Sequence, residues 1–204
     1  NVSRQDIFAQ SDLLGLVEEE IGRALTLYLK TADAILAGSG VRLLDAPPNF
    51  YSLKHNFFSA LFLFSYHQAK IRRDRRILYT AINQCLRGMV TGCDNLLEGE
   101  YKQTLATDLP QTATRFRSVL DIMVSDRVFF DLMLMAMDAN YLTQKKKKKA
   151  GALSLRALLR SGVQEAGEES GIQKIRLPEE VLQSVHHYKT GLLFQAPWTI
   201  PAVF

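Results

Sequence analysis

Hydrophobic and polar positions follow one another along this chain with the period of helices. Apolar residues recur at three- and four-residue steps through most of the sequence. No stretch shows a two-residue alternation bounded by hairpin turns, so strands are not predicted. The sequence therefore predicts an all-α fold, with helices over about residues 12–37, 51–70 and 79–101, in a region that begins at Pro110, over residues 152–171, and from Pro178 onward.

The segment Tyr79–Tyr101 combines an apolar face with acidic residues near its end. Asp94 and Glu98 are four residues apart, which places both carboxylates on one side of a helix, with about 5 to 6 Å between their Cβ atoms. Two carboxylates in a mostly apolar wall repel each other and lose hydration, unless a cation joins them. Mg²⁺ accepts one or two protein carboxylates and fills its other positions with water or phosphate oxygens. Asp94 and Glu98 are therefore candidate Mg²⁺ ligands; the alternative is a pair of solvated acids at a helix end that Gly99 terminates.

The composition predicts one domain over residues 1–204, because the chain has 204 residues of which 47% are hydrophobic. The formal net charge is +4, and five of the positive charges lie in the run Lys145–Lys149. Since the excess is local, nucleic-acid binding is not predicted. Five adjacent like charges predict a solvated basic loop at residues 144–150. The alternative is a polybasic surface that meets anionic lipid.

Other features point to a cytoplasmic protein. Cys85 and Cys93 lie on the apolar helix without CxxC spacing, which predicts reduced thiols. The N-terminal residues show no basic start followed by an apolar run, so no signal peptide is expected. The longest apolar stretch, Phe57–Tyr66, is too short to span a bilayer, and no transmembrane segment is predicted.

Four segments resemble motifs of the trans-polyprenyl diphosphate synthase family. The run LPEEVLQSVHHYKTGLLF, which contains Lys189 and Thr190, looks like the family segment that ends in Lys-Thr-Gly and an apolar helix. Asp94-Asn95-x-x-Glu98 is similar to the first aspartate-rich motif, DDxxD, and precedes Lys-Thr by about the family's separation. Two further segments fall in the family's order, SLKH before an apolar helix in place of GGKRxRP and IMVSD in place of LAGD.

The resemblance implies a class I isoprenoid synthase, a single-domain helical bundle around a central apolar cavity with Mg²⁺ at its mouth. The implied partners are an allylic prenyl diphosphate (geranyl, farnesyl or geranylgeranyl diphosphate) and a second copy of the chain in a homodimer. By resemblance, Asp94 and Glu98 are the catalytic metal ligands, and the diphosphate is held by Lys189, Thr190 and Lys54. Weaker candidates, of which Gln164 and Glu168 lie where the family has GQxxD, are Asn95, Gln164, Glu168 and Gln195.

Departures from the family pattern narrow the expected activity. Lys102-Gln103-Thr104 replaces an Arg-Arg-Gly motif, and Phe57 replaces the second arginine of GGKRxRP. Those arginines hold isopentenyl diphosphate in the chain-elongating enzymes, so the resemblance favours a terpene synthase that uses one allylic diphosphate. A second aspartate-rich motif does not occur in residues 1–204, so C-terminal helices of the domain are expected to be missing from this sequence. The alternatives are a prenyltransferase and a non-catalytic partner subunit of one.

Overall fold

The computed structural model describes residues 4–169, 171 and 177–204, and over these ranges the chain is helical without β-strands. Only an isolated antiparallel bridge joins Leu43 to Thr107. The all-α prediction is confirmed. The α-helices are α1 Arg4–Leu36, α2 Phe57–Gln68, α3 Arg73–Glu98, α4 Thr114–Asp138, α5 Gln144–Glu169, α6 Pro178–Glu180 and α7 Leu192–Thr199. Short 3₁₀ turns are η1 Pro48–Tyr51 and η3 Pro201–Val203, and a π-helical segment is η2 Val181–Gly191.

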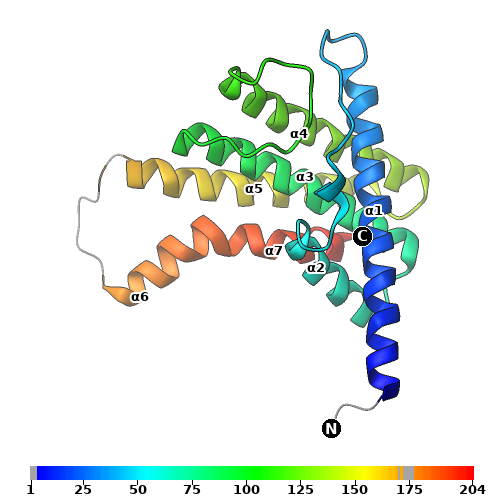
Figure 1. Ribbon diagram of the computed structural model, residues 1–204. Helices are drawn as coiled ribbons and strands as arrows, with labels where there is room; N and C mark the ends of the chain where they lie inside the picture. Colours follow the sequence, from blue (N-terminus) through cyan, green and yellow to red (C-terminus); the bar gives the residue numbers. More distant parts are fainter. Residues whose placement is uncertain (1–3, 170, 172–176) are drawn as a thin grey trace.

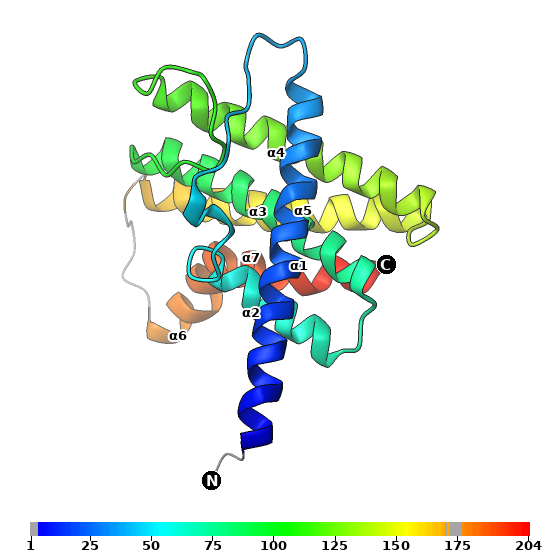
Figure 2. The same ribbon diagram turned by 45° about the vertical axis from the view of Figure 1, so that its right-hand side comes forward.

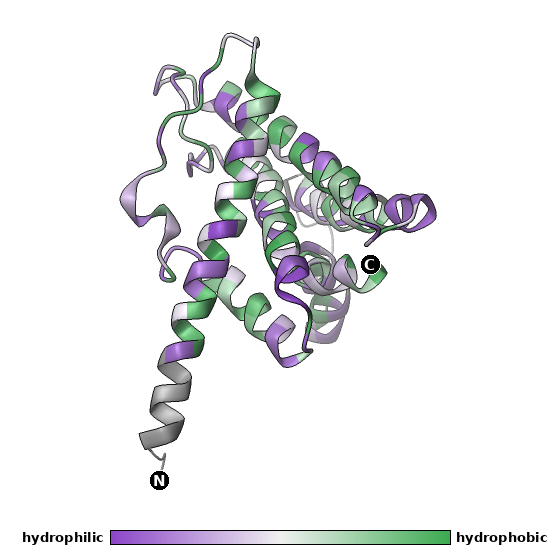
Figure 3. Cartoon of the chain, turned by 90° about the vertical axis from the view of Figure 1, so that its right-hand side faces the viewer, coloured by the Kyte–Doolittle hydropathy of each residue, from purple (hydrophilic) through white to green (hydrophobic). Residues whose placement is uncertain are grey.

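The helices form a bundle in which α1 crosses the others steeply. Helices α3, α4 and α5 run across Figure 1, and α1 passes over them from top to bottom. The turned view in Figure 2 keeps this crossing, and α1 packs against both α3 and α4. The continuous helical rod made by η2 and α7 packs on α5, while α2 packs on α3. Apolar residues gather where these helices face one another, as the hydropathy colouring of Figure 3 shows.

Helices α3 and α4 pack closely because α3 presents two glycines to α4. A Cβ atom on Gly92 would lie 2.6 Å from the side chain of Ile122 and 2.8 Å from the carbonyl oxygen of Ser118. A Cβ atom on Gly88 would collide with the hydroxyl of Ser125. The same hydroxyl forms a buried hydrogen bond of 2.8 Å with the Tyr28 hydroxyl of α1. Three helices are thus tied together along the glycine face of α3.

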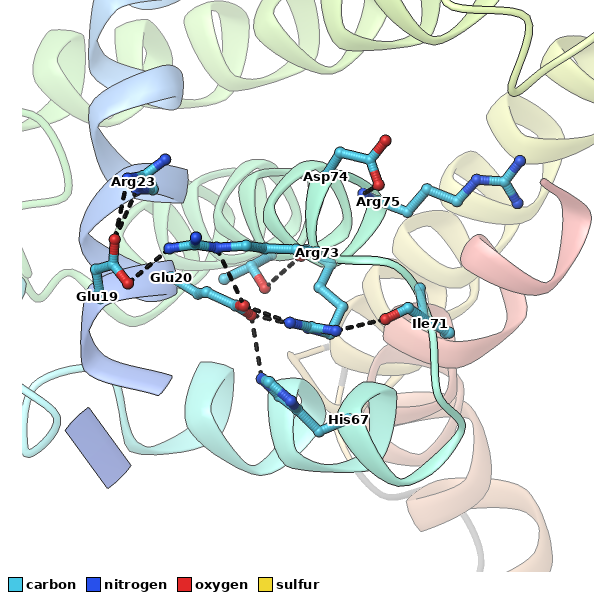
Figure 4. A network of polar contacts seen from close by, with 10 residues as sticks. Glu19, Glu20, Arg23, His67, Ile71, Arg73, Asp74 and Arg75 are labelled. Atoms are coloured by element: carbon cyan, nitrogen blue, oxygen red, sulfur yellow. Dashed lines mark hydrogen bonds and ion pairs between the residues drawn. The ribbon is translucent and has the colours of Figure 1, made fainter. Parts of the chain in front are cut away.

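A buried carboxylate fixes the start of α3 to α1 and α2. The side chain of Glu20 on α1 is fully buried, and Arg76 donates to it from Nε at 2.9 Å. The ring nitrogen Nε2 of His67 on α2 lies 3.1 Å from the same carboxylate. Figure 4 shows Arg73 reaching Glu19 as well, with a distance of 2.6 Å. Both Glu20 oxygens therefore have cationic or ring N–H partners.

Several predicted helix boundaries are wrong at their N-terminal ends. Helix α1 begins before residue 12, and α3 begins at Arg73 instead of Tyr79. The second helix begins at Phe57 instead of Tyr51. The buried amide of Asn56 donates to the carbonyls of Phe50 and Ser52, which holds residues 50–56 in turns. At the C-terminal end of α3 the prediction is confirmed, because Gly99 has the positive φ of +69° that ends a helix.

The basic loop predicted at residues 144–150 is wrong, because these residues form the first turns of α5. Lysine has a good helix propensity, and charge repulsion in a solvated run costs little when the helix is held elsewhere. Ala150 and Ala157 are buried and anchor this helix against the bundle. The amphipathic helix predicted from residue 152 therefore extends backward through the lysines.

Two further expectations can be compared with the described residues. Cys85 is buried, Cys93 is half-buried, and both are free thiols, as expected. None of the described helices combines the length and the apolar character needed to cross a membrane.

Candidate functional site

A cavity of about 620 Å³ lies between α3 on one side and the start of α2, α5, η2 and α7 on the others. Its volume is within the range typical of small-molecule sites. The lining includes all five of the main site residues expected from the sequence, which are Lys54, Asp94, Glu98, Lys189 and Thr190. Segments separated by more than a hundred residues therefore converge at one place, and Asp94 and Lys189 share a cavity as expected.

One face of α3 forms the longest wall of the cavity. Asn83, Arg87, Val90, Asp94 and Glu98 all line it, at steps of three and four residues. With a rise of about 1.5 Å per residue, this face extends over roughly 22 Å. The carboxylates stand at one end and Asn83 at the other. The opposite face of α3 carries the glycines that contact α4, so α3 has one side for packing and one for the cavity.

The acidic group at the cavity end consists of Asp94, Glu98 and Glu165. Asp94 is half-buried, and its carboxyl pKa is raised above the usual range, first by burial and then by repulsion from Glu98 and Glu165. Lys102 and Lys189 oppose this effect without cancelling it. The anionic form of Asp94 is thus under-compensated. A further cation at this point would relieve both the repulsion and the cost of burial.

Lys189 is held by carboxylates of α5. Its Nζ atom lies 2.8 Å from Glu165 and 2.8 Å from Glu168, and these two hydrogen bonds are the main reason that the pKa of Lys189 is raised. Ser161 donates to the carbonyl oxygen of Lys189 at 2.7 Å and ties η2 to α5. The π-helical backbone of η2 carries both Lys189 and Thr190. Such wide turns replace the regular α-helical register, and they are frequent at functional sites.

Glu165 is the acidic residue that the sequence did not single out. The weaker candidates were its neighbours Gln164 and Glu168. Gln164 does not line the cavity and instead donates to Glu168 at 3.2 Å, while Glu168 reaches Lys189. Glu165 lies four residues after Ser161 and faces the cavity with it. A helical wheel of α5 places Ser161 and Glu165 on one face. That face could be recognised as part of a site only if Lys189 were already known to lie opposite it.

Arg87 is a second residue missed from the sequence. It lies on the cavity face of α3 and is half-buried. Its guanidinium donates to Asn56 Oδ1 at 3.2 Å and lies 3.1 Å from His55 Nε2. No ion pair with a carboxylate of the described residues is found for it. Burial lowers the pKa of Arg87, yet a guanidinium stays charged at any physiological pH.

The surroundings of Arg87 make a polar corner of the cavity. Lys54 and His55 line the cavity beside it, and burial together with the nearby guanidinium lowers the pKa of His55. A neutral His55 ring can accept a hydrogen bond from Arg87. The corner therefore has two cations, Arg87 and Lys54, and no carboxylate of the described residues forms an ion pair with either of them.

The remaining cavity walls are apolar and aromatic. Phe58 and Phe194 meet edge to face with 5.5 Å between ring centroids, and Phe62 packs in the same way against Trp198 at 5.0 Å. Leu86 and Leu193 also line the cavity. These walls separate the acidic group from the inner end, where the buried Asn83 side chain donates to the Tyr66 hydroxyl at 3.1 Å.

Two weaker candidates do not belong to this site. Asn95, the amide in the first motif, is buried and pairs with Lys102, donating to its carbonyl at 3.0 Å and accepting from its N–H at 2.8 Å. It therefore holds the chain that follows α3 and does not line the cavity. Gln195 is exposed and is also absent from the lining.

Comparisons with known proteins do not identify the chain. No protein-family model matches it, and neither a curated protein nor a solved structure matches it. Over residues 4–169, 171 and 177–204, no group of three or more His, Cys, Asp and Glu side chains is arranged to hold a metal ion by itself. A Mg²⁺ ion that takes two carboxylates and otherwise water or phosphate oxygens needs no such group.

Proposed function

We propose that this protein ionises a single allylic prenyl diphosphate with the help of Mg²⁺, in the manner of a class I terpene synthase. The observation that carries the proposal is the presence, in one cavity, of the under-compensated Asp94 carboxylate beside two further acids, of cationic side chains and of aromatic walls. Geranyl, farnesyl and geranylgeranyl diphosphates have a polyanionic head and an apolar tail, and such a cavity matches both parts. The motif resemblance of Asp94-x-x-x-Glu98 and Lys189-Thr190 points to the same chemistry.

The carboxylates supply the ligands that this reaction requires. Asp94 and Glu98 would hold Mg²⁺ through their oxygens, with Glu165 close enough to Asp94 to affect its charge. Bound Mg²⁺ supplies neutralisation of the charge that develops on a departing diphosphate. Asp94 stands nearer the apolar part of the cavity than the exposed Glu98, so we expect the loss of its charge to be the more damaging.

The cations would bind and orient the diphosphate. Lys189 has three N–H donors and donates two of them to Glu165 and Glu168, so one remains for a phosphate oxygen. The Thr190 hydroxyl lines the cavity beside it. Phe58, Phe62 and Phe194 would surround the prenyl tail and exclude water from the carbocation left behind. Aromatic faces also stabilise positive charge.

A prenyltransferase is the second candidate, because Arg87 and Lys54 offer a second place for an anion. Loss of the family arginines argues against binding of isopentenyl diphosphate. Arg87, however, brings a guanidinium to the cavity without a carboxylate partner among the described residues. A guanidinium binds phosphate oxygens with charge-assisted hydrogen bonds. Elongation of an allylic diphosphate would favour this second reading.

Diphosphate release tests the proposal. The protein is incubated with each of the three allylic diphosphates, with and without Mg²⁺, and released diphosphate is measured for the wild type, Asp94→Ala, Asp94→Asn and Lys189→Ala. Glu100→Ala is the matched control, because Glu100 is an exposed acid just after α3 that does not line the cavity. We expect Mg²⁺-dependent release that falls at least about 100-fold in Asp94→Ala and stays within about twofold in the control.

Two outcomes would decide against the proposal. Absence of release from every substrate by the wild type, or equal release by Asp94→Ala, would leave the non-catalytic partner reading. Lengthened products in the presence of isopentenyl diphosphate would replace the terpene synthase with the prenyltransferase.

A further inference from the structure

One end of the molecule carries a concentration of positive charge that the cavity does not use. We call it the basic end, and it consists of Arg72, Arg73 and Arg75 near the start of α3 and Lys145–Lys149 at the start of α5. Tyr141 connects the two segments, since the Arg75 guanidinium lies 4.8 Å from its ring centroid and its hydroxyl donates to Asp74. In Figures 1 and 2 the starts of α3 and α5 lie on the side of the molecule away from α6.

The lysines of the basic end are not neutralised by neighbouring acids. Arg72 pairs with Asp74 at 2.9 Å, and Arg73 pairs with Glu19. By contrast, Lys145–Lys149 form no ion pair with a carboxylate of the described residues. The positive end of the α5 macrodipole adds to their charge. Acids are the residues that stabilise a helix start, so these lysines add to the positive field there and favour the binding of an anion.

Apolar side chains adjoin these lysines. The Lys147 ammonium lies 4.0 Å from the ring centroid of Phe130, and Phe130 is 41% exposed. Leu134, one helical turn further along α4, is 38% exposed. Lysine ammonium groups above exposed apolar side chains suit a membrane surface, where the charges meet headgroups and the apolar groups enter the boundary below them.

We propose that the basic end binds anionic lipid headgroups at a membrane surface. Single-stranded nucleic acid would need aromatic faces on which bases stack, but the ammonium of Lys147 already stacks on the Phe130 ring, whose side chain is otherwise partly exposed. The five adjacent charges are ammonium groups, which attract anionic headgroups as point charges and do not require a fixed bidentate geometry. Each lysine near an anionic bilayer strengthens binding by roughly fivefold.

The orientation on the membrane follows from α5. This helix runs from the lysines at its start to Glu165 and Glu168 near its end, a distance of roughly 30 Å from Lys145 to Glu165. A protein attached through the basic end therefore keeps the acidic group away from the anionic surface. The inference does not depend on the proposed catalytic activity.

Co-sedimentation with vesicles tests the inference. Phosphatidylcholine vesicles with and without about a third phosphatidylserine are mixed with the wild type and with the triple variant Lys145→Gln/Lys148→Gln/Lys149→Gln, which keeps the two lysines that contact Phe130 and Phe204. The matched control is Lys30→Gln/Arg115→Gln/Arg156→Gln, which removes three exposed charges elsewhere. Circular dichroism is measured on all three proteins to check that each is helical.

We expect binding to anionic vesicles that weakens about 100-fold in the lysine variant, changes less than about threefold in the control, and falls with added salt. Equal binding to neutral vesicles would overturn the inference, as would unchanged binding by the lysine variant or no binding by the wild type. Tighter binding to a single-stranded oligonucleotide than to the anionic vesicles at the same salt would assign the basic end to nucleic acid instead.

Discussion

Glu20 and Asp94 are both carboxylates that the helical bundle withdraws from bulk water, yet their surroundings differ. Glu20 is fully buried and receives Arg76 and His67. Asp94 is half-buried and has Glu98 and Glu165 near it, with a raised pKa as the result. A buried acid whose partners are complete serves the architecture of the bundle. An acid that lies beside other acids in a cavity is not neutralised by the chain itself, so it still favours the binding of a cation.

The largest effect is expected at Glu20. Replacing Glu20 with Gln removes the negative charge while Arg76 stays buried against α1 and α2, and this should lower the free energy of unfolding by about 3 to 5 kcal/mol. Urea denaturation followed by circular dichroism measures the change, with exposed Glu18→Gln as the control. A loss below about 1 kcal/mol would erase the distinction between the two acids.

Asp121 provides an intermediate case, a buried acid whose partners are incomplete. Its Oδ2 atom has no hydrogen-bond partner in the described structure, and burial raises its carboxyl pKa to about 6. A raised folded-state pKa means that the contribution to stability is complete below about pH 3.9 and is lost as the pH rises through about 6. Asp121→Asn should therefore be more stable than the wild type by about 3 kcal/mol at pH 7 and about equal at pH 4. An equal difference in the free energy of unfolding between the variant and the wild type at pH 7 and at pH 4 would contradict this.

A smaller effect is expected from filling the acidic group with a cation and an anion together. The Mg²⁺–diphosphate complex, at about ten times its dissociation constant, should stabilise the wild type by about 1.4 kcal/mol. Thermal unfolding of Asp94→Asn should be insensitive to the pair, while Glu100→Gln should respond like the wild type. An equal response from Asp94→Asn would move the metal away from this group.

The smallest effect concerns Asp94 without added ligand. Because its folded-state pKa is raised, the wild type loses stability as the pH rises from about 4 through that pKa, and Asp94→Asn does not. The variant should be more stable than the wild type at pH 7 by at most about 1 kcal/mol, since Asp94 is only half-buried. Destabilisation at pH 7 would show that Asp94 already has a sufficient partner.

Helical periodicity predicted the class of fold, and motif spacing predicted five residues that line one cavity. Apolar steps in residues 79–101 predicted most of α3, and Gly99 predicted its end. The Asp94 and Lys189 motifs were expected to share a cavity, and they do. Local signals of this kind survive because they depend on one helix at a time, or on spacing that a related fold would fix.

Features that depend on contacts between helices were not predictable in the same way. The sequence predicts a loop at the lysine run because like charges repel one another, while the burial of Ala150 and Ala157 that stabilises α5 depends on neighbouring helices. Glu165 and Arg87 could not be identified as site residues from the sequence for a related reason. Each is an isolated charge in a helical pattern, and its value follows only from the segment that packs opposite, η2 for Glu165 and the start of α2 for Arg87.

The glycines of α3 that pack on α4 offer a way to change the width of the cavity from outside its lining. Gly88 and Gly92 do not line the cavity, but they allow the close contact between α3 and α4, and the opposite face of α3 lines the cavity. A methyl group at Gly92 would lie 2.8 Å from the carbonyl oxygen of Ser118, a backbone atom, so α3 would have to shift away from α4 and toward its cavity-lining side. Substitutions at the contact between α3 and α4 could thus change which ligand lengths fit, while every ligand-facing side chain stays as it is.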